Sequence, residues 1–268
     1  FHPVYHPWNW RGWWDFGTGA LGDMGCHILD PVFKALMLGH ATAVEASSTP
    51  VNIQSPPNAE FIRYEFPRRD NLPKVAMPAV TVNWYDGGLM PPRPDELLDG
   101  QQMGDDGGGC IFHGTRGKIM CGTYGQNPTL LPTSKMNDFV PPEKKIRRIA
   151  NALEGGHEQD WIRACKENPD RRLEASSNFD YAAPLNEMVL LGVLASRLQS
   201  LNRKLLWDGP NMRFTNISSG DTLQILTEDH FEITDGDPQF DKEHVTVPAL
   251  STINEWIRHS YRQGWEQI

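Results

Sequence analysis

The sequence predicts an α+β fold in which an open-faced, mainly antiparallel β-sheet carries helices packed on one face. Segments rich in β-branched and aromatic residues gather in the first half, and amphipathic helical patterns dominate the second. The connections between the strands lack the helical period that parallel crossovers need. Helices before and after the strands must bury their apolar stripes on one face of the sheet. We therefore expect residues 1–268 to form a single domain.

A helix is predicted over residues 18–38, after an arm over residues 1–16 that is rich in Trp, Pro and His and has no steady period. Thr18 is the expected cap and Gly39 the expected stop. Pro31 cannot donate a backbone hydrogen bond, so we expect a kink there or a restart with Asp30 as a new cap. The apolar residues that give this helix its buried face recur every three or four positions: Leu21, Met24, Ile28, Val32 and Ala35.

Strands are predicted in the segments that follow, because each is rich in β-branched or aromatic residues and is bounded by Pro or Gly. They lie at residues 43–47, 59–66, 79–85, 110–113 and 118–122. The last two are joined through GTRG, which favours a hairpin. Beyond them the pattern predicts helices at residues 157–166, 184–201 and 251–262, and one further strand at residues 212–215.

Charge and hydropathy exclude two classes of partner. The chain has 25 Lys and Arg against 34 Asp and Glu, a net charge of −9, so it has no basic surplus to displace counterions from nucleic acid. No apolar run approaches the roughly 18 residues of a membrane span.

Cys26, Cys110, Cys121 and Cys165 form no CxxC pair and are predicted to be buried thiols. Phe1 stands where an initiator Met would be, and we expect the chain to begin partway into a longer gene product.

A dinucleotide site would require a strand and then GxGxxG at the start of a helix, so that backbone N–H groups meet the pyrophosphate. Gly19, Gly22 and Gly25 follow a Trp-rich loop instead of a strand, and Asp23 would place a negative charge beside a phosphate. The glycines at residues 107–109 follow two aspartates and lead into a strand. We expect no cofactor-binding residues in this chain.

Asp23 and His27 lie four residues apart in the first predicted helix, so both side chains emerge on one face. A carboxylate beside an imidazole orients the ring and stabilises its protonated form. Such a histidine can take a proton from a hydroxyl as hydride leaves the same carbon. A structural ion pair explains the same spacing, and the surrounding residues bear on the choice.

Those surroundings resemble a known family. Residues 10–27 read WRGWWDFGTGALGDMGCH and are similar to the start of the second domain in bacterial Gfo/Idh/MocA proteins, relatives of glucose–fructose oxidoreductase and inositol dehydrogenase. Further segments agree in order: WYDGG at 84–88, SNFDY at 177–181, LLG at 190–192, WDG at 207–209 and YRQGW at 261–265. The resemblance therefore extends over nearly the whole chain.

The resemblance implies that His27 is the acid/base and that Asp23 is its partner or a ligand of a substrate hydroxyl. Family members add a lysine from a Glu-Lys-Pro motif in their nucleotide-binding domain, and this sequence contains no such motif. NAD or NADP is then expected to be held by a Rossmann domain absent from this chain, and the fragment alone is expected to be inactive. A bacterial cytoplasm and a periplasm both stay open as locations.

Five further residues are predicted to bind the substrate. Arg11 lies beside Trp13 and Trp14, and a guanidinium can hydrogen-bond a sugar hydroxyl while an indole faces the ring, although packing explains the three equally well. Asp86 ends a predicted strand, where a turn is the alternative. His157 begins a predicted helix, where the alternative is a capping or surface histidine.

The favoured function is that of the substrate-binding part of an NAD(P)-dependent oxidoreductase acting on a sugar or cyclic polyol. A glycoside-cleaving enzyme that works by oxidation and elimination is one alternative, and a non-catalytic sugar-binding or oligomerisation module is another. We also expect a homo-oligomer through the sheet face. His2 and His6 could be imagined with His27 around a metal, but no suitably spaced carboxylate or Cys joins them, so no metal is predicted.

Overall fold

The main sheet of the computed structural model has five strands in the order β3-β2-β1-β7-β8, and each neighbouring pair is antiparallel. The structure describes residues 2–72, 77–258 and 260–265. The strands of the main sheet are β1 (Ala43–Ser48), β2 (Glu60–Phe66), β3 (Val80–Tyr85), β7 (Leu205–Asp208) and β8 (Arg213–Phe214). The predicted α+β class with a mainly antiparallel sheet is confirmed.

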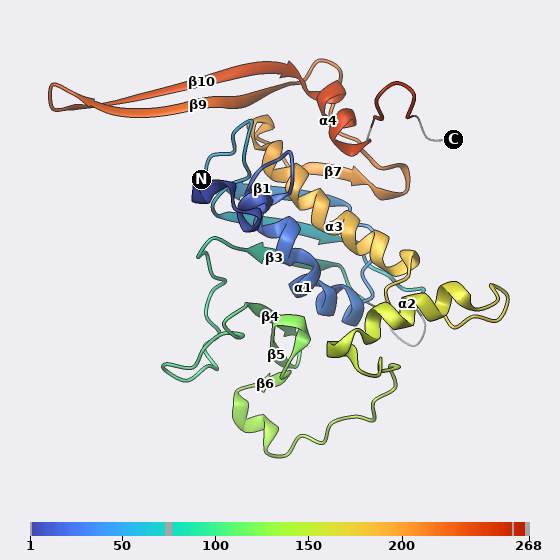
Figure 1. Ribbon diagram of the computed structural model, residues 1–268. Coiled ribbons are helices and arrows are strands. Elements are labelled where there is room, and N and C mark those ends of the chain that lie inside the picture. The colour runs from blue at the N-terminus through green and yellow to red at the C-terminus, as the bar shows by residue number, and fades with distance from the viewer. Residues whose placement is uncertain (1, 73–76, 259, 266–268) are drawn as a thin grey trace.

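Helices α1 (Gly19–Ala35) and α3 (Phe179–Arg197) lie next to each other over one face of this sheet (Figure 1). Strand β2 points Ile62 and Tyr64 into the space between sheet and helices, and neither side chain is exposed. Gly192 lets α3 approach closely, because a Cβ there would lie 2.0 Å from the Tyr64 hydroxyl oxygen. One face of the sheet is therefore covered by both amphipathic helices, as predicted.

The opposite face of the main sheet is polar. Strand β2 presents Arg63 and Glu65 there, and the Lys204 Nζ lies 2.7 Å from a Glu65 carboxylate oxygen. Phe61 and Tyr85 add an aromatic pair with ring centroids 5.0 Å apart. Apolar residues inward and polar residues outward are typical of an antiparallel sheet with one face in water.

A second, smaller sheet is formed by β4 (Gly109–Gly114), β5 (Gly117–Gly122) and β6 (Thr129–Leu131). The predicted hairpin between β4 and β5 is confirmed. The expectation that it would continue the main sheet is wrong. Leu97, Met120 and Leu131 form a separate small cluster there, while Cys110 and Phe112 of β4 pack against the main core.

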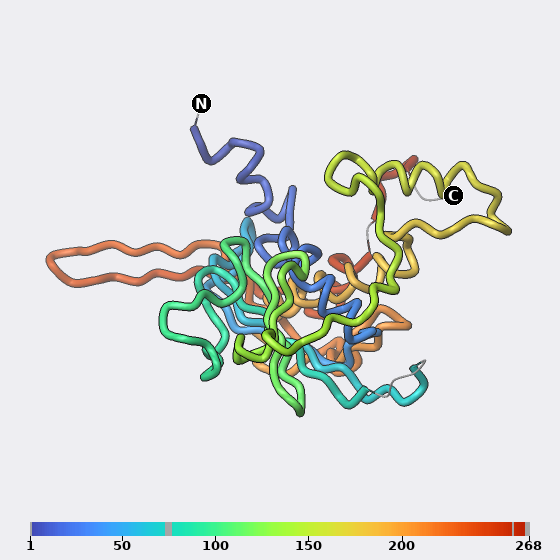
Figure 2. The backbone as a smooth tube through the Cα atoms, turned by 90° about the horizontal axis from the view of Figure 1, so that it is seen from below, coloured from blue at the N-terminus to red at the C-terminus, as the bar shows by residue number. Residues whose placement is uncertain are grey.

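Strands β9 (Thr222–Thr234) and β10 (Asp237–Pro248) form a long hairpin that projects from the body in two perpendicular views (Figures 1 and 2). We call it the hairpin arm. Its turn uses positive φ angles at Asp235 and Gly236, which suit a two-residue hairpin loop. Phe231 and Phe240 are cross-strand partners with ring centroids 5.1 Å apart, and both are exposed.

Two features of α1 differ from the expectation. The helix runs unbroken through Pro31, so the predicted restart at Asp30 does not occur. Burial of Leu29, Val32 and Phe33 in the main core on either side of the proline offsets the lost hydrogen bond. The helix also ends before residue 38, and the left-handed backbone position after it falls on Met37 rather than on Gly39.

The remaining helices follow the prediction with shifted ends. Helix α2 (Gly156–Lys166) begins one residue early, and α4 (Ala249–Ile257) is shorter than expected. Helix α3 begins at Phe179 rather than at Pro184, because the Asn178 side chain caps it by accepting from the Tyr181 backbone N at 3.2 Å. None of the described helices is long and apolar enough to cross a membrane.

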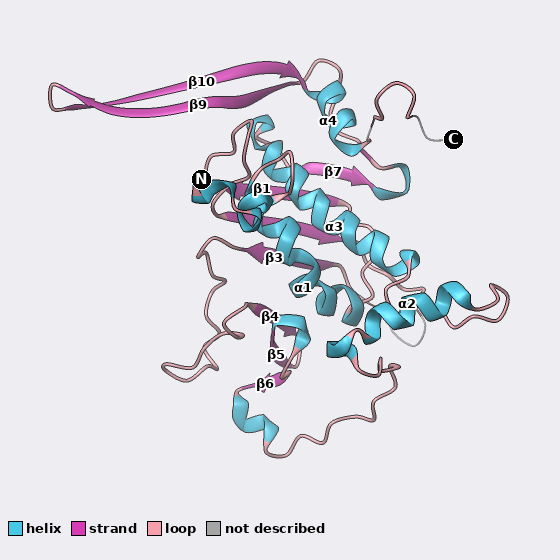
Figure 3. Ribbon diagram, viewed as in Figure 1, coloured by secondary structure: helices cyan, strands magenta, loops and turns pink. Residues whose placement is uncertain are grey.

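Short 3-10 helices join these elements (Figure 3). They are η1 (Pro3–Tyr5), η2 (Pro7–Gly12), η3 (Thr123–Gly125), η4 (Thr133–Met136), η5 (Ala152–Glu154), η6 (Gln199–Leu201) and η7 (Gly209–Asn211). The prediction of four buried thiols holds only in part. Cys121 is buried and Cys110 half-buried, whereas Cys26 and Cys165 are exposed on the outer faces of α1 and α2.

Candidate functional site

Helix α1 carries Asp23 and His27 on one half-exposed face. The helix forms here because its apolar residues, such as Leu21 and Leu29, recur on the opposite face and pack into the main core. Helix η2 contacts the first part of α1, and η3 contacts it farther along. The two predicted catalytic residues therefore lie on α1 between two short helices from distant parts of the sequence.

Asp23 forms an ion pair with Arg11 of η2. Their side chains keep 30% and 36% of their exposed area, so the pair is in contact with solvent. The Arg11 guanidinium also lies 3.9 Å from the centroid of a Trp8 ring, and its Nε donates to the Trp8 carbonyl oxygen at 3.1 Å. These contacts attach the aromatic N-terminal segment to the start of α1 and bring Arg11 and Asp23 together, a pairing that the sequence analysis did not predict.

His27 lies against Tyr124 of η3 rather than against Asp23. The two rings meet edge to face, with centroids 5.2 Å apart. Among the described residues, neither ring nitrogen of His27 has a hydrogen-bond partner, so Asp23 does not orient this imidazole. The predicted orienting contact is therefore missing, and the imidazole is half-exposed.

The predicted tryptophans do not converge on His27. Trp14 turns away from the α1 face: its Nε1 donates to the Asn52 carbonyl oxygen at 3.0 Å, and the Arg197 guanidinium lies 4.6 Å from its ring centroid. Trp13 is half-buried, without a side-chain hydrogen bond to any described residue. The N-terminal segment instead exposes Trp8 and Trp10, whose exposed fractions are 68% and 45%.

Asp86 lies in a network at the end of the main sheet. One carboxylate oxygen accepts from the Glu60 backbone N at 2.9 Å, and the other accepts from the Trp84 Nε1 at 2.8 Å. Glu60, buried under α3, accepts a hydrogen bond from the Ser196 hydroxyl. Burial raises the pKa of Asp86, and it raises the pKa of Glu60 to about 7. Both oxygens of Asp86 thus have structural partners, and its contact with substrate stays a prediction.

His157 is the second residue of α2 and is exposed. The helix begins after a left-handed Gly155, and no described residue forms a hydrogen bond or ion pair with the His157 side chain. The position matches the predicted helix start. No observed contact brings His157 to Asp23 or His27.

Both glycine clusters are occupied by packing or turn contacts. A Cβ at Gly22 would collide with the Thr18 hydroxyl, and one at Gly25 would lie 2.8 Å from Val189 of α3, so these glycines serve helix packing rather than a phosphate. In the second glycine cluster, the Asp105 carboxylate already accepts from the Gly107 backbone N at 2.9 Å. No group of three or more His, Cys, Asp or Glu among the described residues could hold a metal ion.

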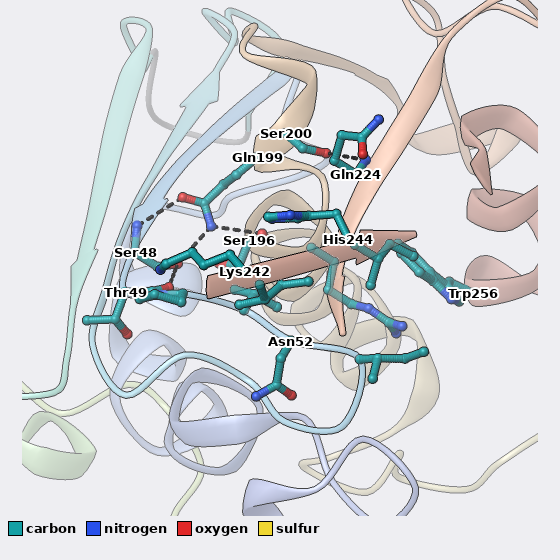
Figure 4. A pocket seen from close by; sticks show the side chains of 16 residues that line it. Ser48, Thr49, Asn52, Ser196, Gln199, Ser200, Gln224, Lys242, His244 and Trp256 are labelled. Carbon is teal, nitrogen blue, oxygen red and sulfur yellow. Dashed lines mark hydrogen bonds between the residues drawn. The ribbon is translucent and has the colours of Figure 1, made fainter. Parts of the chain in front are cut away.

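A cavity of about 280 Å³ lies beside the hairpin arm (Figure 4). Arg197 lines it, as do His244 and Lys242 from the arm and Trp256 from α4. A second cavity, of about 640 Å³, lies between β8 and α4. Neither cavity includes Asp23 or His27 in its lining. Sequence reasoning missed Arg197 and Tyr124, because only the fold brings them to their partners.

Comparison with known families finds one match. Residues 2–63 match the model of the oxidoreductase family, C-terminal alpha/beta domain. A search of curated proteins finds no match. The matched segment includes the N-terminal arm, α1 and β1, and it contains Arg11, Asp23 and His27 but neither Asp86 nor His157. The match over residues 2–63 agrees with the resemblance to the Gfo/Idh/MocA oxidoreductase family inferred from the sequence.

Proposed function

We propose that this chain is the substrate-binding part of an NAD(P)-dependent oxidoreductase that acts on a sugar or cyclic polyol, with His27 as the acid/base. The observation that carries the proposal is the His27 imidazole, which is half-exposed and has no hydrogen-bond partner among the described residues. A structural histidine usually has its nitrogens satisfied. This one keeps them available on a segment that matches an oxidoreductase family.

The chemistry assigned to His27 is proton transfer. Oxidation of a secondary alcohol removes a hydride from carbon and a proton from the hydroxyl oxygen, and an imidazole accepts that proton near neutral pH. A nicotinamide would supply the hydride acceptor, and the proposal assigns it to a domain outside these residues. Within this chain, the His27 ring packs against the Tyr124 ring with the two planes nearly perpendicular.

The Arg11–Asp23 pair is assigned to binding substrate hydroxyls. A hydroxyl both donates and accepts, so a guanidinium beside a carboxylate offers it both kinds of partner within one site. The exposed faces of Trp8 and Trp10 supply apolar planes of the kind that pack against the C–H faces of sugar rings. Asp23 in this role is a hydroxyl ligand, which the lack of a hydrogen bond to His27 favours over the role of an orienting partner.

The test uses the intact gene product that contains these residues. It is incubated with aldoses, their acids and cyclic polyols, each with NAD or NADP, and reduced nicotinamide is followed by absorbance. Asp23→Asn should raise KM more than it lowers kcat, because a hydroxyl ligand acts mainly in binding. Asp15→Asn, at an exposed position of the same arm, is the matched control and should keep both constants.

Two results contradict the redox proposal. Release of free sugar from a glycoside without net reduction of nicotinamide would favour the elimination chemistry. Failure to turn over any substrate class, by protein that binds sugars saturably, would favour the non-catalytic module.

We also propose that the chain forms a homo-oligomer through the open face of the main sheet. The aromatic pair of Phe61 and Tyr85 and the exposed Leu206 are apolar parts of that face, which also carries charged side chains. A surface of this kind fits a small, polar interface rather than a large apolar one.

A further inference from the structure

The cavity beside the hairpin arm is built from four segments that are distant in sequence. The end of β1 and the loop after it contribute residues 48–53, and the end of α3 with η6 contributes Ser196, Arg197, Gln199 and Ser200. The hairpin arm adds residues from both of its strands, and α4 adds Trp256 (Figure 4). A volume of about 280 Å³ is enough for a small molecule of several heavy atoms.

The charge of this cavity is opposite to that of the chain. The whole chain has a net charge of −9, yet none of the 16 lining residues is Asp or Glu. Three basic side chains line it: Arg197, Lys242 and His244. Lys242 is partly neutralised from outside the cavity, because its Nζ lies 3.0 Å from an Asp229 carboxylate oxygen. Arg197 has no acidic partner among the described residues.

Arg197 is held in a fixed orientation. Its guanidinium carbon lies 3.5 Å from the centroid of a Trp256 ring and 4.6 Å from that of a Trp14 ring. Contacts with aromatic rings stabilise the cation and leave the N–H groups at the edge of the guanidinium plane free to donate. Burial lowers the pKa of Arg197 to about 10, so the group stays charged at neutral pH.

The end of a helix is a sufficient reason for a cation at this position, since Arg197 is the last residue of α3. The helix end does not explain why the N–H groups of the Arg197 guanidinium lack acceptors. No described carbonyl or carboxylate oxygen accepts from the guanidinium, although buried polar groups are normally hydrogen-bonded. A half-buried cation with free N–H groups at the wall of a cavity points to an acceptor that comes from outside the chain.

Other donors of the cavity are free as well. The Asn52 side-chain oxygen accepts from the backbone N of Gln54 and of Ser55, at 2.8 and 2.7 Å, whereas its amide nitrogen has no acceptor among the described residues. The Trp256 indole N–H and the His244 ring also have no hydrogen-bond partner among the described residues. Gln199 is fully used: it accepts from the Ser48 backbone N at 2.9 Å and donates to Ser48 Oγ at 2.7 Å, which makes it a rigid part of the wall.

We propose that this cavity binds an oxyanion, the phosphate or carboxylate group of a small polar molecule, with Arg197 as its main ligand and His244 and Asn52 as further donors. An oxyanion only accepts hydrogen bonds, so it matches a site with spare donors and no acid. The arm contributes His244, so binding would also fix the base of the arm against the body.

The experiment is titration calorimetry with inorganic phosphate, with gluconate and with glucose 6-phosphate, and with glucose as the uncharged control. We expect saturable one-to-one binding of at least one anion that weakens as sodium chloride is raised, and none of glucose at this site. Phosphate binding without gluconate binding identifies a phosphate site, and the reverse identifies a carboxylate site.

Three variants decide the assignment. Arg197→Gln should weaken binding at least about tenfold, since it removes charge-assisted hydrogen bonds. His244→Gln, on the exposed arm, should weaken it several-fold without affecting the fold. Arg116→Gln removes a charge from the exposed β4–β5 turn and should leave affinity unchanged. Circular dichroism verifies that each variant is folded.

Several outcomes overturn the proposal. One is the absence of saturable binding of all three anions up to about 10 mM, where even weak sites fill. A second is a folded Arg197→Gln protein with wild-type affinity, or, should that variant not fold, a His244→Gln protein with wild-type affinity. An equal loss in Arg116→Gln would indicate a general charge effect and would also contradict it.

Discussion

Replacing Glu60 with Gln is expected to remove a destabilisation that grows as the pH rises. Glu60 is 4% exposed and lies between β2 and α3, where the Ser196 hydroxyl donates to it and the Asp86 carboxylate faces it. Burial raises the pKa of Glu60 from 4.5 to about 7, and the nearby Asp86 raises it further than burial alone. A glutamine has the same shape and can keep both contacts without a charge.

The magnitude follows from the shift in pKa. At about 1.4 kcal/mol per unit, a rise of this size is worth about 3 kcal/mol of folding free energy. The folded state holds the Glu60 proton more tightly than the unfolded state. The stability of the folded protein is therefore highest with respect to this group below pH 4.5, and it falls as the pH rises through about 7. At pH 8 the wild type should therefore be less stable than Glu60→Gln by up to about 3 kcal/mol.

Urea unfolding at pH 4.5 and at pH 8, followed by tryptophan fluorescence, measures the difference. The stability gain of Glu60→Gln over wild type should be large at pH 8 and small at pH 4.5. Glu228→Gln, at an exposed position of the hairpin arm, should show no such difference. If the difference in stability between Glu60→Gln and wild type were the same at pH 8 as at pH 4.5, the raised pKa of Glu60 would be refuted.

Two further predictions concern packing and cofactor binding. Gly192→Ala should cost about 1–3 kcal/mol of unfolding free energy, because its Cβ would meet the buried Tyr64 hydroxyl and Leu21. Gly39→Ala, with open space around it, should cost little. Equal effects of the two substitutions in urea unfolding would contradict the close contact of α3 with the sheet. The 268-residue chain should show no saturable NAD(H) binding in calorimetry, and low-micromolar binding would contradict the assignment of the cofactor to another domain.

Local patterns predicted most of the elements that have a buried face. The 3.6-residue period of α1 and the alternation in β2 both follow from one apolar side packed on a core, so the sequence carries the signal directly. Strand β7 was missed, because a four-residue strand between Asn202 and Gly209 is too short for a period and gains its place only by pairing with β1.

The hairpin arm was missed for a different reason. Its strands are rich in charged residues, and neither face is buried over most of their length. The signal was nevertheless present: Asp235-Gly236 is a strong hairpin turn, and Phe231 and Ile233 alternate with polar residues before it.

The candidate site was predicted in its residues more than in its contacts. Asp23 and His27 share a helix face, which spacing alone gives. The partner of each comes from elsewhere: Arg11 from the arm and Tyr124 from η3. The i, i+4 rule predicts that two side chains are neighbours but not that they bond to each other, so the choice of partner required the fold.

The central claim, that His27 is the acid/base of an oxidoreductase, is tested most directly by His27→Ala in the intact gene product. Turnover should fall by about a hundredfold or more, the usual contribution of a general acid/base, while circular dichroism stays unchanged. His113→Ala, at an exposed position of β4, is the control and should keep wild-type turnover. Wild-type turnover in His27→Ala would contradict the account and leave His27 as a surface residue packed on Tyr124.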